Sequence, residues 1–138
     1  MPAKDIYHDA VKNALIKDGW RITRDPYTIK YQEVQLFADL LADKMVEAQR
    51  DGQQIIVEIK SFINRSPMRE FETALGQYII YRILLNKILP EANIYLAISQ
   101  GIYQSFFRQK AIQLILQETQ VRLIIVNIKN EEIIQWIS

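Results

Sequence analysis

The apolar positions near the N-terminus recur at helical spacing and predict a helix over residues 5–17. Asp18-Gly19 should end this helix, because glycine can take the left-handed conformation that closes many helices. A short strand is expected over residues 20–23, a turn at Asp25-Pro26, and a further extended stretch around residues 27–31. The apolar positions of the helix are Ile6, Ala10, Val11, Ala14 and Leu15.

The middle of the chain has the pattern of a β-hairpin. Asp51-Gly52 is a strong signal for a two-residue turn, and residues 54–60 after it are rich in strand-forming side chains. Residues 43–49 are the expected partner strand. A helix over residues 40–50 is the competing prediction, because helix propensity does not exclude it.

Helices and strands should alternate in the second half of the chain. Ser66 is a predicted N-cap and Pro67 a predicted first helical residue, for a helix that runs to about Ile88. A strand, a helix and two strands should follow over residues 93–98, 103–117, 121–128 and 133–137. The order, roughly αβββαβαβ, predicts an α/β protein with a mixed central β-sheet flanked by helices, in a single domain over residues 1–138.

Composition narrows the class of protein. The 138 residues are 49% hydrophobic and 24% charged, which fits a folded globular chain. No apolar run approaches the roughly 20 residues that a membrane helix needs, and the first residues, MPAKD, do not resemble a signal peptide. The absence of cysteine excludes disulfides and thiol chemistry and favours a cytoplasmic location.

Charge and metal-ligand types narrow it further. The formal net charge of +1 does not by itself indicate a nucleic-acid-binding surface. Because the chain has one histidine, any metal must bind mainly through carboxylates, which favours a hard cation such as Mg²⁺.

The candidate chemistry lies on the strand over residues 54–60. Strand alternation puts Glu58 and Lys60 on one face, opposite the face of three apolar residues, Ile55, Val57 and Ile59. With a two-residue turn at Asp51-Gly52, Lys60 faces Asp43, so Asp43 lies beside both Glu58 and Lys60. Asp39 shares that face but lies ~13 Å further along, unless a bulge or bend brings it back.

Two carboxylates and a lysine on one sheet face suit metal-dependent phosphodiester cleavage. Glu58, with Asp43 or Asp39, can hold Mg²⁺ and leave positions for a phosphate oxygen and a water. Lys60 can orient that water or neutralise developing charge. The alternative interpretation is an ordinary salt-bridged strand surface.

The predicted helix over residues 67–88 adds polar side chains. Gln77 and Tyr81 share a helix face and can position a nucleotide backbone, although a normal polar helix edge explains them as well. Arg65, Arg69 and Arg82 are candidate phosphate contacts, or part of a solvated charged face.

Near the N-terminus, His8 can supply a third ligand or bind a water, while a surface or capping histidine is the plainer interpretation.

Several stretches together resemble the XisH family, the fdxN-element excision controlling factor proteins. They span nearly the whole chain. They are AVKNALIKDGW at 10–20, Asp25-Pro26, VEIKSF at 57–62, ALGQY at 74–78, and Tyr81-Arg82.

The resemblance implies a restriction-endonuclease-like fold of the PD-(D/E)xK superfamily. It also implies a role in a mostly cyanobacterial process, the site-specific excision of a DNA element during heterocyst differentiation. In that process the family works alongside a recombinase and a companion protein, XisI. Many relatives occur where no such excision is known.

Carried over to this chain, the resemblance supports Glu58 and Lys60 as the nuclease-like pair and Gln77 with Tyr81 as the Gln-x-x-x-Tyr signature of RecB-like nucleases. The preceding aspartate is Asp39 or Asp43. Here the chain reads DLLAD, where the family pattern is DLGAE, so Leu41 replaces a glycine.

Two functional hypotheses follow. The first is a Mg²⁺-dependent endodeoxyribonuclease that supports DNA recombination. The second is a non-catalytic regulator that keeps the nuclease fold and binds DNA, a recombinase or an XisI-like companion protein. Apolar residues at Leu84-Leu85 and over 133–137 can form an interface between copies of the chain, or belong to the core.

Overall fold

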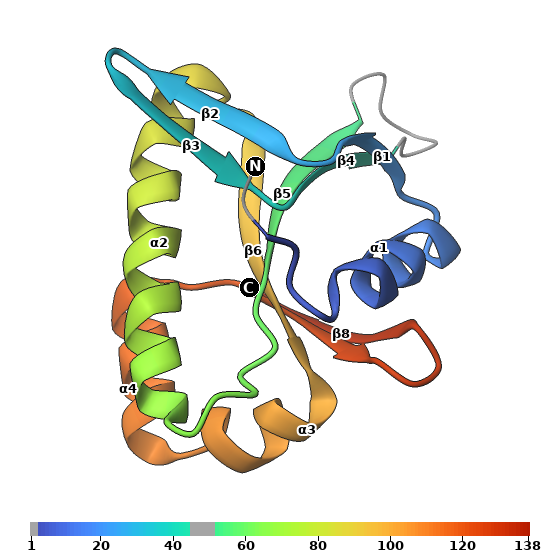
Figure 1. Ribbon diagram of the computed structural model, residues 1–138, viewed down its shortest axis with the longest axis vertical. Helices are drawn as coiled ribbons and strands as arrows, with labels where there is room; N and C mark the ends of the chain where they lie inside the picture. The colour runs from blue at the N-terminus through green and yellow to red at the C-terminus, as the bar shows by residue number, and fades with distance from the viewer. Residues whose placement is uncertain (1–2, 45–51) are drawn as a thin grey trace.

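A six-stranded mixed sheet forms the centre of the protein in the computed structural model, which describes residues 3–44 and 52–138 (Figure 1). The strand order is β1-β4-β5-β6-β7-β8. Strands β5, β6 and β7 are parallel neighbours, while β1, β4 and β8 pair antiparallel at the two sides. The strands are β1 (Arg21–Arg24), β4 (Leu40–Lys44), β5 (Gln53–Ile59), β6 (Ala92–Ser99), β7 (Leu123–Asn127) and β8 (Glu132–Ile137).

Helices cover both faces of this sheet, so the predicted α/β class with a mixed central sheet is confirmed. Helix α1 (His8–Lys17) lies on one face, and α2 (Pro67–Ile88) and α4 (Lys110–Thr119) lie on the other (Figure 1). None of the helices in the described part of the chain is both long enough and apolar enough to cross a membrane.

The sheet therefore separates two hydrophobic cores. Side chains such as Leu15 of α1 pack against Val57 and Ile59 of β5. On the other face, Tyr78 of α2 packs in the same core as Ile56. Alternate residues of β5 thus enter different cores, as the alternation of the strand requires.

Local signals set the ends of the helices as predicted. The Ser66 hydroxyl accepts a hydrogen bond from the Arg69 amide at 3.3 Å, with Pro67 at the first helical position of α2. Helix α1 ends where Gly19 has φ +94°, a conformation that favours glycine.

A second hairpin was not predicted. Strands β2 (Tyr27–Tyr31) and β3 (Val34–Ala38) form a separate two-stranded sheet that lies against α2 (Figure 1). Ile29 is fully buried in the α2-side core. This hairpin delivers the chain directly to Asp39.

The predicted helix over residues 103–117 is interrupted. The chain forms α3 (Gln100–Ile102), a π-helical turn η1 (Tyr103–Phe107) and then α4. Gln109 is extended, with φ −60° and ψ 141°, so one continuous helix was wrong. The predicted strand over 43–49 is seen only at Asp43 and Lys44, the end of β4; its remaining residues and the predicted Asp51 turn lie outside the described residues.

Candidate functional site

The register of β4 on β5 brings Asp39 to Glu58. The β4–β5 ladder ends with Leu40 opposite Val57, so the next facing pair is Asp39 and Glu58. The Asp39 amide donates to Glu58 Oε1 at 3.1 Å, and the Ile59 amide donates to Asp39 Oδ2 at 2.7 Å. These two side-chain hydrogen bonds continue the pairing where the backbone ladder stops, and they fix both carboxylates.

Lys60 completes a carboxylate–lysine cluster. Its Nζ lies 3.9 Å from Glu58 Oε2. The Glu58 side chain is 6% exposed, whereas that of Lys60 is 25% exposed. The acid is therefore buried while the ammonium group keeps access to solvent.

Burial makes this cluster electrostatically unusual. Burial, and then the nearby Asp39 charge, raise the pKa of Glu58 to about 8, although Lys60 opposes the shift. Burial also raises the pKa of Asp39, against the hydrogen bond from the Ile59 amide and the charges of His8 and Lys60. At neutral pH the pair therefore holds a proton in the absence of a cation.

Helix α2 carries the two residues of the predicted Gln-x-x-x-Tyr pattern. Burial, followed by the charges of Glu58 and Asp39, raises the pKa of Tyr81 to about 12. Gln77 lies one turn earlier, and its Oε1 is buried without a hydrogen-bond partner. A buried acceptor without a partner is uncommon and marks a place where a ligand can be received.

Helix α1 contributes a network that the sequence did not reveal. His8 is 3% exposed, and its Nε2 lies 2.8 Å from Asp25 Oδ1. Lys12 Nζ donates to Asp25 Oδ2 at 2.7 Å. The His8 Nδ1 atom lies 4.0 Å from Asp39 Oδ1. The interpretation of His8 as a surface or capping residue was wrong. The sequence predicted Asp25 only as part of a turn.

Asp43 does not reach the cluster. It faces Gln54, and its carboxylate accepts two hydrogen bonds from Arg21, at 2.7 and 3.0 Å. The predicted hairpin pairing was wrong by six residues, because Asp43 faces Gln54 rather than Lys60. Of the two rival aspartates, Asp39 is the one that lies beside Glu58.

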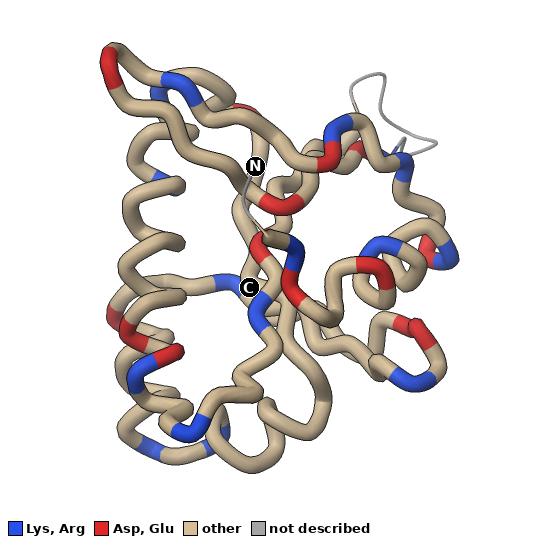
Figure 2. The backbone as a smooth tube through the Cα atoms, viewed as in Figure 1, with Lys and Arg blue, Asp and Glu red and all other residues tan. Residues whose placement is uncertain are grey.

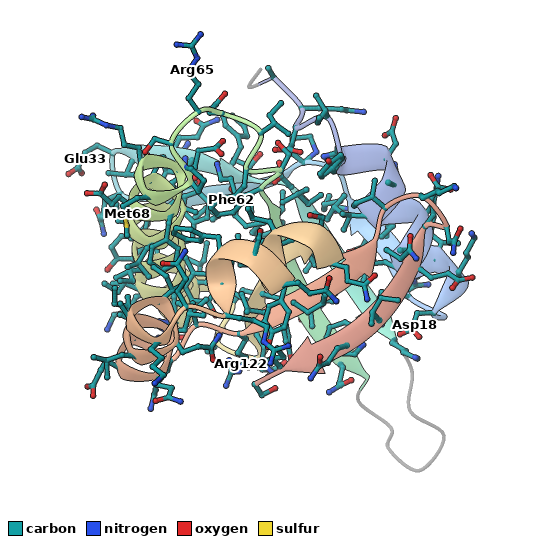
Figure 3. All side chains as sticks on the ribbon, turned by 90° about the horizontal axis from the view of Figure 1, so that it is seen from below. Asp18, Glu33, Phe62, Arg65, Met68 and Arg122 are labelled. Atoms are coloured by element: carbon teal, nitrogen blue, oxygen red, sulfur yellow. The ribbon has the colours of Figure 1, made fainter. Side chains whose placement is uncertain are left out.

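The three candidate arginines lie in different surroundings. Arg65 and Arg69 are exposed, and Figure 3 shows Arg65 extending from the body of the protein into solvent. Arg82 Nη1 instead donates to the backbone carbonyls of Thr119 and Gln120, at 2.8 and 3.2 Å, at the end of α4. Acidic and basic positions are interspersed along the described backbone (Figure 2).

A large hollow lies away from the cluster. It has a volume of about 920 Å³, lies beside the C-terminal part of α2, and is lined by polar residues such as Asn93, Gln117 and Arg122. None of Asp39, Glu58 and Lys60 lines it. Perturbed acids and an unpartnered amide, rather than cavity size, therefore identify the candidate site.

The donor set suits a cation that needs few protein ligands. Over residues 3–44 and 52–138, no group of three or more His, Asp or Glu side chains is placed to hold a metal. Asp39 and Glu58 offer a pair of carboxylates. Mg²⁺ is commonly bound by one or two carboxylates, with waters and substrate phosphates filling the other positions. The pair therefore fits Mg²⁺ and does not fit a metal that needs an all-protein cage.

Fold and cluster together define an α/β protein with a buried glutamate, a partly buried aspartate and a lysine at the end of the β4–β5 ladder. The chain belongs to the XisH family, whose model, described as "XisH protein", matches residues 1–134.

Two solved structures are similar over almost the whole chain. An XisH family protein from Nostoc punctiforme PCC 73102 is 41% identical, with a TM-score of 0.88 over 97% of this chain and 100% of that one. An fdxN element excision controlling factor protein from Anabaena variabilis is 42% identical, with a TM-score of 0.88 over 98% of this chain and 100% of that one. None of the curated proteins compared with the chain matches it.

Proposed function

We propose that this protein cleaves DNA phosphodiesters with Mg²⁺, using Asp39 and Glu58 to hold the cation and Lys60 to assist the attacking water. The observation that carries the proposal is the pairing of Asp39 with Glu58, with Lys60 Nζ 3.9 Å from Glu58 Oε2. Two carboxylates and a lysine at the end of a paired strand are the groups that this chemistry needs.

The two neighbouring carboxyl groups of Asp39 and Glu58 favour the binding of a cation. Burial of Glu58, and then repulsion from the nearby Asp39 carboxylate, raise the pKa of Glu58 to about 8. A divalent ion supplies the missing positive charge, polarises the phosphate and acidifies a bound water. Such a site releases its proton when it is loaded, which gives the proposal a measurable signature.

The remaining side chains divide the work of binding. Lys60, whose side chain is one quarter exposed, can donate a hydrogen bond to the attacking water and neutralise charge at the phosphate. The unpartnered amide oxygen of Gln77, with Tyr81 beside it, offers contacts to a nucleotide. Arg65 and Arg69 project from the surface and suit phosphate contacts, whereas Arg82 is already engaged at the end of α4.

We further propose that this site belongs to a restriction-endonuclease-like fold of the PD-(D/E)xK superfamily. The Anabaena variabilis relative is an fdxN element excision controlling factor. By that likeness, we place this chain in DNA-element excision, together with a recombinase and an XisI-like companion. The mixed sheet, with Asp39 directly before β4, Glu58 on β5 and Lys60 directly after β5, supports this assignment.

The test is cleavage of supercoiled, linear, branched and single-stranded DNA by pure protein with and without Mg²⁺. We expect Mg²⁺-dependent products that disappear in Glu58→Gln and Lys60→Ala. Asp43→Asn is the matched control, because that carboxylate pairs with Arg21 away from the cluster. The absence of cleavage on every substrate, also with the companion protein present, would overturn the enzymatic function.

The hydrogen bonds that the two acids already accept favour a second function. Asp39 Oδ2 and Glu58 Oε1 each already accept a backbone hydrogen bond, and the net charge is only +1. A non-catalytic regulator would use these two hydrogen bonds only to hold the fold together, and it would bind DNA or a partner protein without Mg²⁺. This regulatory function would be favoured if the protein cleaves no DNA and if Glu58→Gln binds DNA or the companion protein as tightly as the wild type does.

A further inference from the structure

Two buried side-chain atoms lack a hydrogen-bond partner in the part of the chain that the structure describes. They are Gln77 Oε1 on α2 and His8 Nδ1 on α1. Unpartnered buried polar atoms cost free energy and therefore call for a physical reason. The reason for His8 lies in what its other ring nitrogen contacts and in what Nδ1 faces.

The other side of the His8 ring is firmly held. Asp25 Oδ1 lies 2.8 Å from Nε2, and Lys12 Nζ donates to Asp25 Oδ2 at 2.7 Å. Burial opposes ionisation of Asp25, but the hydrogen bond from Lys12 and the charges of His8 and Lys12 lower its pKa overall. Because an ionised carboxylate only accepts hydrogen bonds, Nε2 carries the hydrogen. The ring orientation is thus fixed from α1.

The fixed ring presents Nδ1 to Asp39. Asp39 Oδ2 accepts from the Ile59 amide at 2.7 Å, while Asp39 Oδ1 faces His8 Nδ1 at 4.0 Å. That distance is too long for a hydrogen bond, so the contact acts through packing and charge. The contact is compatible with an ionised or a protonated Asp39. A hydrogen on Nδ1 would complement a carboxylate, and an Nδ1 without hydrogen would complement a carboxylic acid.

We propose that His8, backed by Asp25 and Lys12, is a positioning residue that keeps the Asp39 carboxyl turned toward Ile59 and Glu58. Its importance for cation binding rests on the proposed function, but the positioning itself does not. The His8–Asp25–Lys12 network ties α1 to the end of β5, so it explains why a buried histidine pairs with a partly buried aspartate from another element without entering the acid pair.

Two substitutions separate positioning from mere structural support. Glutamine can place a polar group where Nε2 lies, keeping the Asp25 contact and removing the group that faces Asp39. Asparagine can place one where Nδ1 lies, keeping the group that faces Asp39 and leaving Asp25 without its partner. His8→Gln and His8→Asn therefore have opposite expected effects.

The readout is amide hydrogen exchange at Ile59, whose N–H is bonded to Asp39. The matched control is the next amide, Lys60, whose N–H donates to the Ala97 carbonyl at 3.1 Å. We expect Ile59 exchange, relative to that of Lys60, to rise about tenfold in His8→Gln, equivalent to ~1.4 kcal/mol, and to stay near wild type in His8→Asn. Thermal stability should fall more in His8→Asn, since Oδ1 of the partly buried Asp25 then loses the hydrogen-bond donor that His8 supplies.

An unchanged ratio in His8→Gln would overturn the proposal, and so would an equal rise in both variants. If a His8 variant does not fold, the ring of the wild-type His8 provides a second test. His8 is the only histidine in the sequence, so its ring signals offer a reciprocal measurement. Asp39→Asn should shift them and Asp43→Asn should not, and the reverse result contradicts the contact.

A calorimetric titration with Mg²⁺ alone adds the functional arm. We expect His8→Gln to weaken binding about tenfold and His8→Asn to weaken it less, in the order of the Ile59 exchange. If the wild-type protein binds no Mg²⁺, the proposed function fails while the Ile59 ratio still decides the positioning role. If Mg²⁺ binds equally well in all three, with the Ile59 ratio changed as expected, positioning stands and its link to the cation is wrong.

Discussion

Replacing Glu58 by glutamine should stabilise the metal-free protein, and increasingly so as the pH rises. Glutamine keeps an oxygen that can accept from the Asp39 amide, bonded at 3.1 Å in the wild type. It removes the buried negative charge and can donate to the Asp39 carboxylate. The substitution therefore removes the main source of repulsion while preserving the shape of the side chain.

The magnitude follows from the two pKa values of Glu58. Its ordinary value is 4.5, and the folded value is about 8. Between these values the unfolded chain has lost the proton and the folded chain has kept it, so raising the pH favours unfolding. The free energy of unfolding of the wild type should fall by about 1.4 kcal/mol per pH unit across this window. The total loss is then ~3 kcal/mol at pH 7 and roughly 4 to 5 kcal/mol above pH 8. Below pH 4.5 both states are protonated and the effect vanishes.

The assay is urea unfolding of wild type and Glu58→Gln without divalent ions, at pH values from 4 to 9. The free energy of unfolding of the variant minus that of the wild type should grow with pH and level off near pH 8. Glu72→Gln is the control for charge loss alone, because Glu72 lies exposed on the same protein's α2. If the two variants differ from wild type by the same amount at every pH, the assignment of a buried, proton-holding Glu58 is wrong.

Three further outcomes test the site. Mg²⁺ binding at pH 7 should release close to one proton, which calorimetry detects because the measured heat then depends on the ionisation enthalpy of the buffer. The affinity of the protein for Mg²⁺ should rise about tenfold per pH unit up to pH 8. Glu58→Gln should abolish the proton release. Asp39→Asn should lose Mg²⁺ binding and cleavage, whereas Asp43→Asn should retain both, and calorimetry with the cleavage assay checks this. Arg82→Ala should lower the free energy of unfolding by about 1 kcal/mol, because two carbonyls lose their donor, with little effect on DNA affinity. Arg65→Ala should do the reverse, weakening DNA binding measured by fluorescence anisotropy without changing the unfolding curve; a destabilised Arg65→Ala would contradict its solvent exposure.

Local signals made most of the elements predictable. Ser66 and Pro67 define the start of α2, and Gly19 closes α1, because each acts on its own backbone. Strand β3 was missed since its turn, at Gln32 and Glu33, has neither glycine nor asparagine, although Gln32 has φ 53°. A turn without its usual residues gives no signal in one sequence.

The pairing of β4 with β5 failed for a different reason. The true and predicted pairings differ by six residues, an even number, so every side chain keeps its face. Val57 meets an apolar partner in either register, Leu40 or Val46. Hydrophobic alternation thus established that Asp39, Asp43 and Glu58 share a face but could not decide which aspartate meets Glu58.

The His8 network lay beyond sequence reasoning because it depends on tertiary contact. His8 and Asp25 belong to α1 and to the turn after β1, and nothing in their spacing requires them to meet. A polar residue near a helix start is usually exposed, so only the tertiary fold shows that His8 is buried, with 3% of its surface exposed.

The cost of the acid pair helps to separate the two functions. A regulator that needs only the fold gains nothing from Glu58, since glutamine offers the same acceptor and should make the protein more stable. A nuclease needs the carboxylate, because an amide holds Mg²⁺ far less well. Loss of stability at a functional site is a common trade for activity. A Glu58→Gln protein that is more stable, still folded and unable to bind Mg²⁺ would therefore show a carboxylate kept for its chemistry, while a variant that is less stable at pH 8 would assign Glu58 to architecture.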